Sequence, residues 1–185
     1  MRLYITGIKS LADAEKAVAF GASAVGIKMG YEKDLVHPET ARDIFLNLPV
    51  FISRVGIFAD EKRYNVQELV TFCRLDTLHF IGSEQPEDLK RYSEHILKNF
   101  DPKDLTKVQD YDLHGVVIDL QSGLSKYVEV EMENIKKQSL ILSGDLTLTE
   151  WIDAVKNFHP YAVQLDLTYY HKDPMESFIP LLSLA

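Results

Sequence analysis

Short runs of apolar residues alternate with amphipathic segments along most of this chain, so strand-like and helix-like patterns succeed one another. Eight apolar runs are candidate strands: residues 3–6, 24–28, 50–58, 77–81, 95–99, 115–119, 139–143 and 162–166. Most of these runs are continuously apolar, which is typical of parallel strands buried on both faces. Eight strand–helix alternations predict an α/β protein with a compact (β/α)8 TIM barrel.

Start signals for helices stand between the candidate strands. Ser10 has the position of a helix N-cap, and Pro38 and Pro86 have the position of a first helical residue. Pro86 precedes a helix expected over residues 87–92, and either Thr147 or Thr149 is expected to cap the last clear helix.

The unit after the sixth candidate strand departs from this rhythm. Residues 127–131 alternate between apolar and acidic side chains, which is a strand-like period where a helix is due. Three interpretations stay open for the segment 121–135: an extra edge strand, a partner-binding segment or a solvated connection. We therefore expect an irregular or shortened unit after strand six.

Length and charge narrow the class of protein. The 185 residues predict one barrel domain over residues 1–185 with short loops, since such barrels usually take roughly 250 residues. A net charge of −8 without a basic cluster argues against nucleic acid as a partner. No long apolar run or signal-peptide pattern is present, and the single Cys73 fits a reducing compartment. These features predict a cytoplasmic protein that binds no membrane.

Several short motifs follow one another along the chain in a characteristic order. They are Leu3–Gly7, Asp13-Ala14, Gly21-Ala22, His37-Pro38-Glu39, Arg54–Phe58, Gly82–Pro86, Leu142–Leu146 and Pro160–Val163. Together they resemble the phosphoribosylanthranilate isomerase family, small (β/α)8 barrels of tryptophan biosynthesis, over residues 3–182. A different phosphate-binding barrel is the main structural alternative. The resemblance implies an Amadori rearrangement that needs no cofactor.

The resemblance assigns two catalytic positions. In the family an aspartate at the end of strand six protonates the ribose ring oxygen, and Asp119 matches it. A cysteine at the end of strand one is the family's base, and Thr6 stands at that position. A threonine hydroxyl does not ionise near neutral pH as a tuned thiol does. Cys73 offers no substitute, because its helical position predicts a buried core thiol.

The positions that handle substrate in the family also differ. Asp34 stands where an arginine holds the anthranilate carboxylate, and Lys28 or Lys33 could replace that cation. Ile81 replaces a substrate-facing histidine, and His79, two residues earlier, shares its strand face.

The phosphate site of the family is altered as well. Gly144 is kept, but Asp145 replaces a second glycine, and the family's Asp-Val-Ser-Ser-Gly after strand eight is replaced by residues 164–168, which include Asp166. A like-charge contact at 4 Å costs about 1 kcal/mol in water and about 4 kcal/mol near a protein surface. The ligand-binding candidates are thus Asp34, His79, Gly144, Asp145 and Asp166.

Three classes of function remain on this evidence. The main prediction is a diverged barrel, monomeric or homodimeric, that binds a small molecule or a partner without isomerase chemistry. The alternative is an active isomerase with Asp119 as acid and water, Asp145 or His79 as base, and a third class is another reaction on the same scaffold. The acidic mouth also suggests a cationic ligand or a hard metal ion, although the sequence contains no recognised metal-binding motif.

Overall fold

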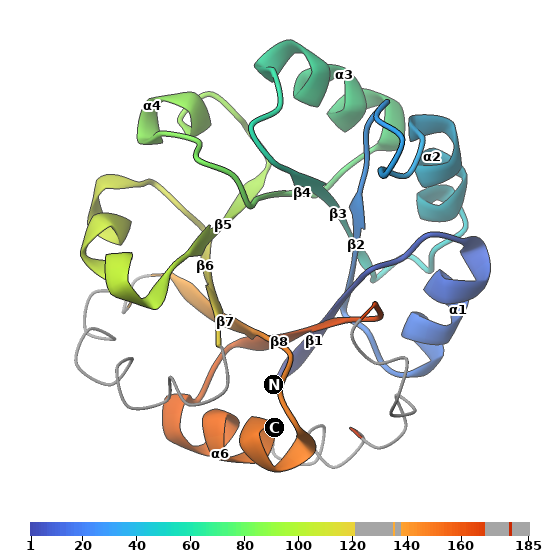
Figure 1. The fold of residues 1–185 in the computed structure, drawn as a ribbon. Coiled ribbons are helices and arrows are strands. Elements are labelled where there is room, and N and C mark those ends of the chain that lie inside the picture. Colours follow the sequence, from blue (N-terminus) through green and yellow to red (C-terminus); the bar gives the residue numbers. More distant parts are fainter. Residues whose placement is uncertain (121–134, 136–137, 169–177, 179–185) are drawn as a thin grey trace.

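Eight parallel strands form a closed barrel in the computed structural model, which describes residues 1–120, 135, 138–168 and 178. The strands follow one another around the ring in chain order, and β1 pairs with β8 to complete it (Figure 1). They are β1 (Arg2–Thr6), β2 (Ala24–Lys28), β3 (Ser53–Phe58), β4 (Thr77–Phe80), β5 (His95–Phe100), β6 (Gly115–Asp119), β7 (Ser139–Ser143) and β8 (Ala162–Asp166). The predicted (β/α)8 barrel is confirmed.

The third strand starts later than the sequence pattern predicts. The strand was expected from residue 50, but β3 begins at Ser53 and residues 50–52 form a turn. The Ile52 N–H donates to the Pro49 carbonyl oxygen at 3.1 Å, which closes this turn. Val50 and Phe51 are 87% and 93% exposed. Because Val50 and Phe51 are apolar, the run of apolar residues begins before the strand does, and such a run does not distinguish a strand from an exposed turn.

Helical segments surround the barrel as an outer ring (Figure 1). They are α1 (Leu11–Ala19), α2 (Pro38–Leu46), α3 (Arg63–Cys73), α4 (Pro86–Leu89), the 3-10 helix η1 (Pro102–Asp110) and α6 (Leu148–Phe158). Ser10 caps α1 through a reciprocal pair of hydrogen bonds with Asp13, as expected from its position. Thr147, rather than Thr149, caps α6 in the same way with Glu150.

Two units are shorter or tighter than the sequence predicts. The helix expected over residues 87–92 is a four-residue segment, α4, that ends at Leu89. After β5 the chain forms η1, a 3-10 helix, instead of an α-helix. Nearly all of the segment 121–135 lies outside the described residues, so its three interpretations stay predictions. Among the described helices none is both long and apolar enough to cross a membrane.

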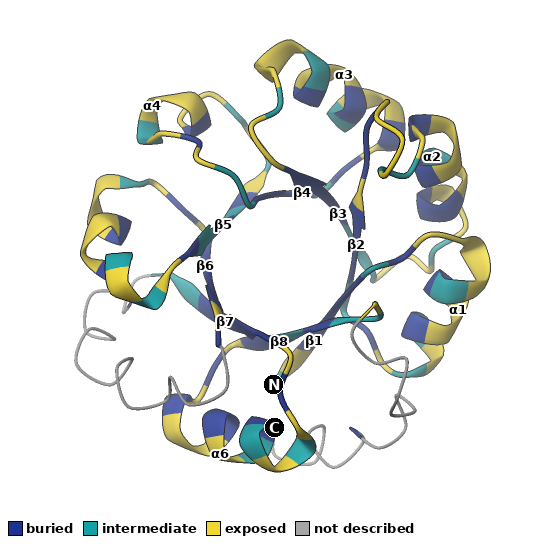
Figure 2. Cartoon of the chain, viewed as in Figure 1, coloured by how far each residue is buried: buried dark blue, intermediate teal, exposed yellow. Residues whose placement is uncertain are grey.

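Two apolar layers hold the barrel together. Inside it, the side chains of Tyr4, Val55, Val117 and Ile141 pack against one another. Outside it, a larger cluster fills the space between strands and helices, so the strands and inner helix faces are buried while the outer helix faces are exposed (Figure 2). Trp151 on α6 is fully buried in this cluster. Each such large apolar side chain contributes about 1.5–3 kcal/mol through its burial.

Candidate active site

The carboxyl ends of the strands surround a cavity of about 450 Å³ at one mouth of the barrel. Six of the predicted catalytic and ligand-binding residues line this cavity. They are Thr6, Asp34, His79, Asp119, Gly144 and Asp166. Barrel enzymes place their active sites at this face. The structure therefore brings together six of the seven residues that the sequence singled out.

Asp145 is the exception. It is exposed and does not line the cavity, although it follows directly after Gly144. Gly144 has φ of +149°, and a side chain there would collide with the backbone of Leu120, so the chain turns sharply at a position that requires glycine. Asp145 is therefore the one of the seven residues that the described cavity does not include, and its role at a phosphate or as a base stays a prediction.

Asp119 ends β6 and opens onto the cavity. Its register partner on β7 is Ser143, whose hydroxyl forms a hydrogen bond with the carboxyl group. Partial burial raises the pKa of Asp119 above its ordinary value, and the Ser143 hydrogen bond only partly opposes this effect. A carboxyl group with a raised pKa keeps its proton to higher pH, which suits a general acid.

Thr6 and Asp166 form a second pair across the seam that closes the barrel. They are register partners on β1 and β8, and the Thr6 hydroxyl donates to the Asp166 carboxylate at 2.9 Å. The other carboxylate oxygen accepts hydrogen bonds from the Thr168 backbone N–H at 2.8 Å and hydroxyl at 2.5 Å. Thr6 is 1% exposed, whereas Asp166 is half-buried. Both residues line the cavity, and the carboxylate is the more exposed group of the pair.

A buried chain of hydrogen bonds crosses the barrel interior below the cavity. The Tyr4 hydroxyl lies 3.1 Å from His79 Nδ1, and His79 Nε2 lies 2.5 Å from the Asn99 side-chain oxygen. Burial lowers the pKa of His79 to about 4, so the ring is neutral near pH 7. Both ring nitrogens are engaged, and His79 thus orients Asn99 at the cavity instead of offering a free base.

Two lysines and the exposed Asp34 also belong to the mouth. Lys28 at the end of β2 and Lys9 after β1 line the cavity, while Lys33 does not. Asp34 lines it too, at the position where the family has an arginine. Within the described ranges, no three His, Cys, Asp or Glu residues lie close enough to hold a metal ion. The metal-binding alternative therefore has no ligand set in this part of the chain.

Cys73 is remote from this chemistry. It ends α3, is fully buried, and does not line the cavity. Burial raises the pKa of its thiol to about 11, so the thiol stays protonated at neutral pH. The prediction of a buried core thiol is confirmed.

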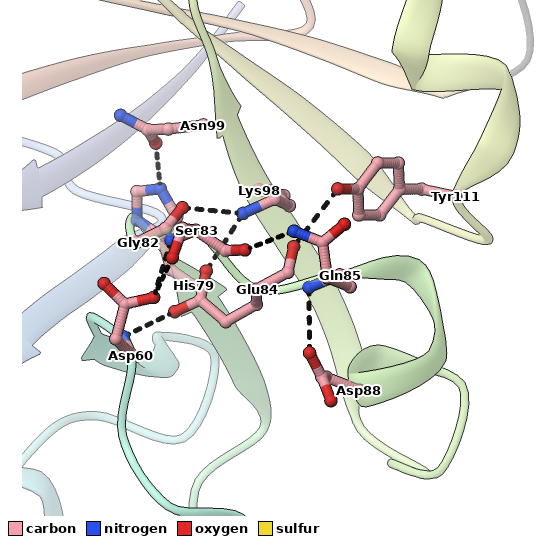
Figure 3. A network of polar contacts seen from close by, with 10 residues as sticks. All are labelled: Asp60, His79, Gly82, Ser83, Glu84, Gln85, Asp88, Lys98, Asn99 and Tyr111. Carbon is pink, nitrogen blue, oxygen red and sulfur yellow. Dashed lines mark hydrogen bonds and ion pairs between the residues drawn. The ribbon is translucent and has the colours of Figure 1, made fainter.

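A second polar network fixes the loops beside the mouth, and the sequence analysis missed it (Figure 3). Lys98 on β5 and Glu84 after β4 form an ion pair of 2.9 Å, with 5% and 8% of their side chains exposed. Lys98 also donates to the Gly82 carbonyl oxygen at 3.0 Å, and Glu84 accepts the backbone N–H of Asp60 at 2.8 Å. The network joins the loops after β3 and β4 to the outer face of β5, and thus supports the rim of the cavity.

Comparisons with known proteins agree with this geometry. The N-(5'-phosphoribosyl)anthranilate isomerase of Geobacter sulfurreducens is 33% identical over 176 residues, covering 89% of this chain and 87% of the relative. The phosphoribosyl anthranilate isomerase structure from Thermus thermophilus has a TM-score of 0.79 and 26% identity, with complete coverage of both chains. A further isomerase structure, in complex with reduced 1-(o-carboxyphenylamino)-1-deoxyribulose 5-phosphate, has a TM-score of 0.81 at 25% identity and covers 97% of this chain and 96% of that one.

No family model matches the chain. The match to the Geobacter protein nevertheless extends over most of both sequences, and the solved isomerases share the complete barrel. The residues that meet at the mouth lie at the carboxyl ends of the strands, the face at which barrel enzymes place their active sites. This chain belongs to the phosphoribosylanthranilate isomerase family.

Proposed function

We propose that the chain catalyses the Amadori rearrangement of N-(5'-phosphoribosyl)anthranilate, with Asp119 as the general acid. The observation that carries the proposal is the position of Asp119 in the cavity, together with the raised pKa of its carboxyl group. The family relationship favours this activity over the inactive barrel that the substitutions at Thr6 and Asp34 suggested.

The role of Asp119 follows from the chemistry of the first step. The carboxyl group gives its proton to the ribose ring oxygen while the anomeric C–O bond breaks and the nitrogen lone pair forms a C=N bond. A raised pKa increases the share of the carboxyl group that holds a proton at a given pH, and that proton is the one the ring oxygen receives. The Ser143 hydroxyl stabilises the carboxylate that remains.

The substrate carries a carboxylate on its aromatic ring, which needs a cation. Lys28 lines the cavity, and within the described residues no acidic partner holds it. Lys28 thus replaces the arginine that this chain lacks at position 34, as a point charge without the bidentate geometry of a guanidinium. The Lys28→Met variant is expected to raise KM more than kcat falls, whereas Lys33→Met, which changes a lysine outside the cavity, leaves both unchanged.

Binding without turnover is the second candidate function. It is favoured by Thr6, whose hydroxyl cannot replace a thiolate, and by the charge of Asp166 on the side where the family holds phosphate. On this hypothesis the protein binds an uncharged or cationic small molecule at the same mouth.

A direct assay separates the two candidates. Purified protein is given N-(5'-phosphoribosyl)anthranilate, and loss of its fluorescence is followed with wild type and Asp119→Asn. Turnover that falls by roughly 10²–10⁴-fold in the variant supports the isomerase. No turnover by wild-type protein above the spontaneous rate refutes it and favours the binding function.

A further inference from the structure

We propose that the Asp166 carboxylate is the catalytic base of this enzyme and that Thr6 is the residue that positions it. The inference rests on the proposed isomerase function. It assigns to a carboxylate on β8 the role for which the family uses a thiolate on β1.

The position of the carboxylate is the first argument. Asp166 is the register partner of Thr6, so it lies beside the strand end where the family's base stands. It is half-buried, lines the cavity, and its charge reaches the barrel interior, where it contributes with burial to a raised pKa of Tyr4. A group in this place can approach a substrate bound at the mouth.

The hydrogen bonds of Asp166 are the second argument. Its Oδ2 accepts from Thr6 at 2.9 Å, and its Oδ1 accepts from the Thr168 backbone and hydroxyl at 2.8 and 2.5 Å. A carboxylate has about four acceptor positions, so three donors fix both oxygens and leave one lone pair free. Fixed orientation with one open lone pair is what proton abstraction from carbon requires.

The environment of Thr6 sets the direction of its hydrogen bond. The Gln164 side-chain amide nitrogen lies 3.4 Å from the Thr6 oxygen and donates to it, which leaves the hydroxyl proton for Asp166. The Gln164 side-chain oxygen is buried and has no hydrogen-bond partner in the described part of the chain. Thr6 therefore serves as a buried donor that holds the carboxylate, not as a base itself.

The other candidate bases lack one of these features. His79 has both ring nitrogens engaged, and Asp145 lies outside the cavity. Asp34 lines the cavity but is exposed, and none of the hydrogen bonds within the described ranges fixes its carboxylate. Asp119 already has the role of general acid in the proposed function, and the upward direction of its pKa shift agrees with that role. Among the residues that the structure describes, Asp166 is thus the oriented carboxylate at the mouth that has no other assignment.

The proton balance of the reaction closes with these two aspartates. After ring opening, Asp166 removes the proton from C2, whose C–H electrons form the C1=C2 bond while the C=N electrons move to nitrogen. The enol then becomes the ketone as its hydroxyl proton passes to the Asp119 carboxylate and C1 takes the proton from Asp166. Both side chains return to their starting states, and no oxidant, reductant or cofactor is consumed.

The test compares three variants with wild type: Asp166→Asn, Thr6→Val and the conservative Thr6→Ser. The first removes the base with little change in shape, the second removes the positioning hydroxyl, and the third keeps it. The readouts are kcat, KM, the pH profile of kcat/KM, and the affinity for reduced 1-(o-carboxyphenylamino)-1-deoxyribulose 5-phosphate. Thermal unfolding of each variant checks that the fold is kept.

We expect Asp166→Asn to lower kcat by roughly 10²–10⁴-fold while the affinity for the reduced compound changes less than about tenfold. Thr6→Val is expected to lower kcat by a smaller factor and to move the lower limb of the pH profile, and Thr6→Ser restores the wild-type profile. Active wild type with an equally active Asp166→Asn variant overturns this inference alone. Inactive wild type overturns the proposed function as well. If Thr6→Val is too unstable to assay, the Asp166→Asn result decides.

Discussion

The buried ion pair of Glu84 and Lys98 leads to a strong prediction about stability. Replacing Glu84 by Leu leaves the Lys98 ammonium with the Gly82 carbonyl oxygen and the Tyr111 ring but no counter-charge, and it removes the acceptor of the Asp60 N–H. Breaking a buried pair in this way costs about 3–5 kcal/mol, because the remaining charge is desolvated without compensation. The lost backbone hydrogen bond adds about 1 kcal/mol.

The predicted loss of about 4–6 kcal/mol is a large part of the stability of an ordinary domain. For a chain of this length it lowers the unfolding temperature by roughly 10–20 °C. The free energy of unfolding is measured by urea denaturation for wild type, Glu84→Leu, Lys98→Met and the double variant.

The double variant is the decisive control. With both charges gone, apolar side chains of similar size occupy the site, and most of the stability returns. The cycle then gives a coupling energy of at least about 2 kcal/mol. Single variants that cost less than about 1 kcal/mol, or losses that simply add, refute the assignment of this pair as a desolvated ion pair.

Three further predictions concern pH. Burial raises the pKa of Asp119, and a general acid must hold its proton, so kcat/KM is expected to fall as pH rises through that pKa. The Asp119→Asn variant is expected to lack this decrease of kcat/KM with pH, and a variant that keeps it contradicts the role. His79 has a pKa of about 4 in the fold against about 6.5 when unfolded, so the free energy of unfolding falls by about 3 kcal/mol between about pH 6.5 and pH 4. Urea denaturation of His79→Gln at several pH values is expected to show a smaller dependence of the unfolding free energy on pH. Partial burial alone would raise the pKa of Asp76, but its hydrogen bonds to Arg54 lower it on balance. The pair therefore stabilises the fold at pH values above the pKa that Asp76 has in the unfolded chain, and this contribution is lost as the pH falls through the pKa of Asp76 in the fold. Because the pair is partly exposed, Asp76→Asn costs less than about 1 kcal/mol at pH 7, and a loss several times larger contradicts this reasoning.

The fold was predictable because its signals are local and repeated. Continuous apolar strands and well-placed caps such as Ser10 recur along the chain, and eight such units in one short chain favour a closed parallel barrel. The error at residues 50–52 has the same origin, since Val50 and Phe51 continue the apolar pattern although they face solvent. Burial depends on the surrounding structure and not on the residue type alone.

The site was only partly predictable from the sequence. Asp119 and Thr6 were singled out through the resemblance to the family's motifs, and both lie at strand ends that meet at one face of the barrel. Asp145 does not line the cavity although it directly follows Gly144, and no local spacing in the sequence distinguishes these two neighbours. The partners of His79 and of Lys98 were missed, because Tyr4, Asn99 and Glu84 come from other strands and loops and no local spacing connects them.

The chain of hydrogen bonds from Tyr4 through His79 to Asn99 has a consequence for how the barrel opens. It links β1 to β4 and β5 through the interior of the barrel. Tyr4 and His79 are 75 positions apart in the sequence, and His79 and Asn99 are 20 positions apart. The Tyr4 hydroxyl and the His79 ring are buried from solvent, so their protons exchange with water only when the strands separate. Slowly exchanging hydroxyl and imidazole proton signals in nuclear magnetic resonance spectra therefore report the rate at which these strands open.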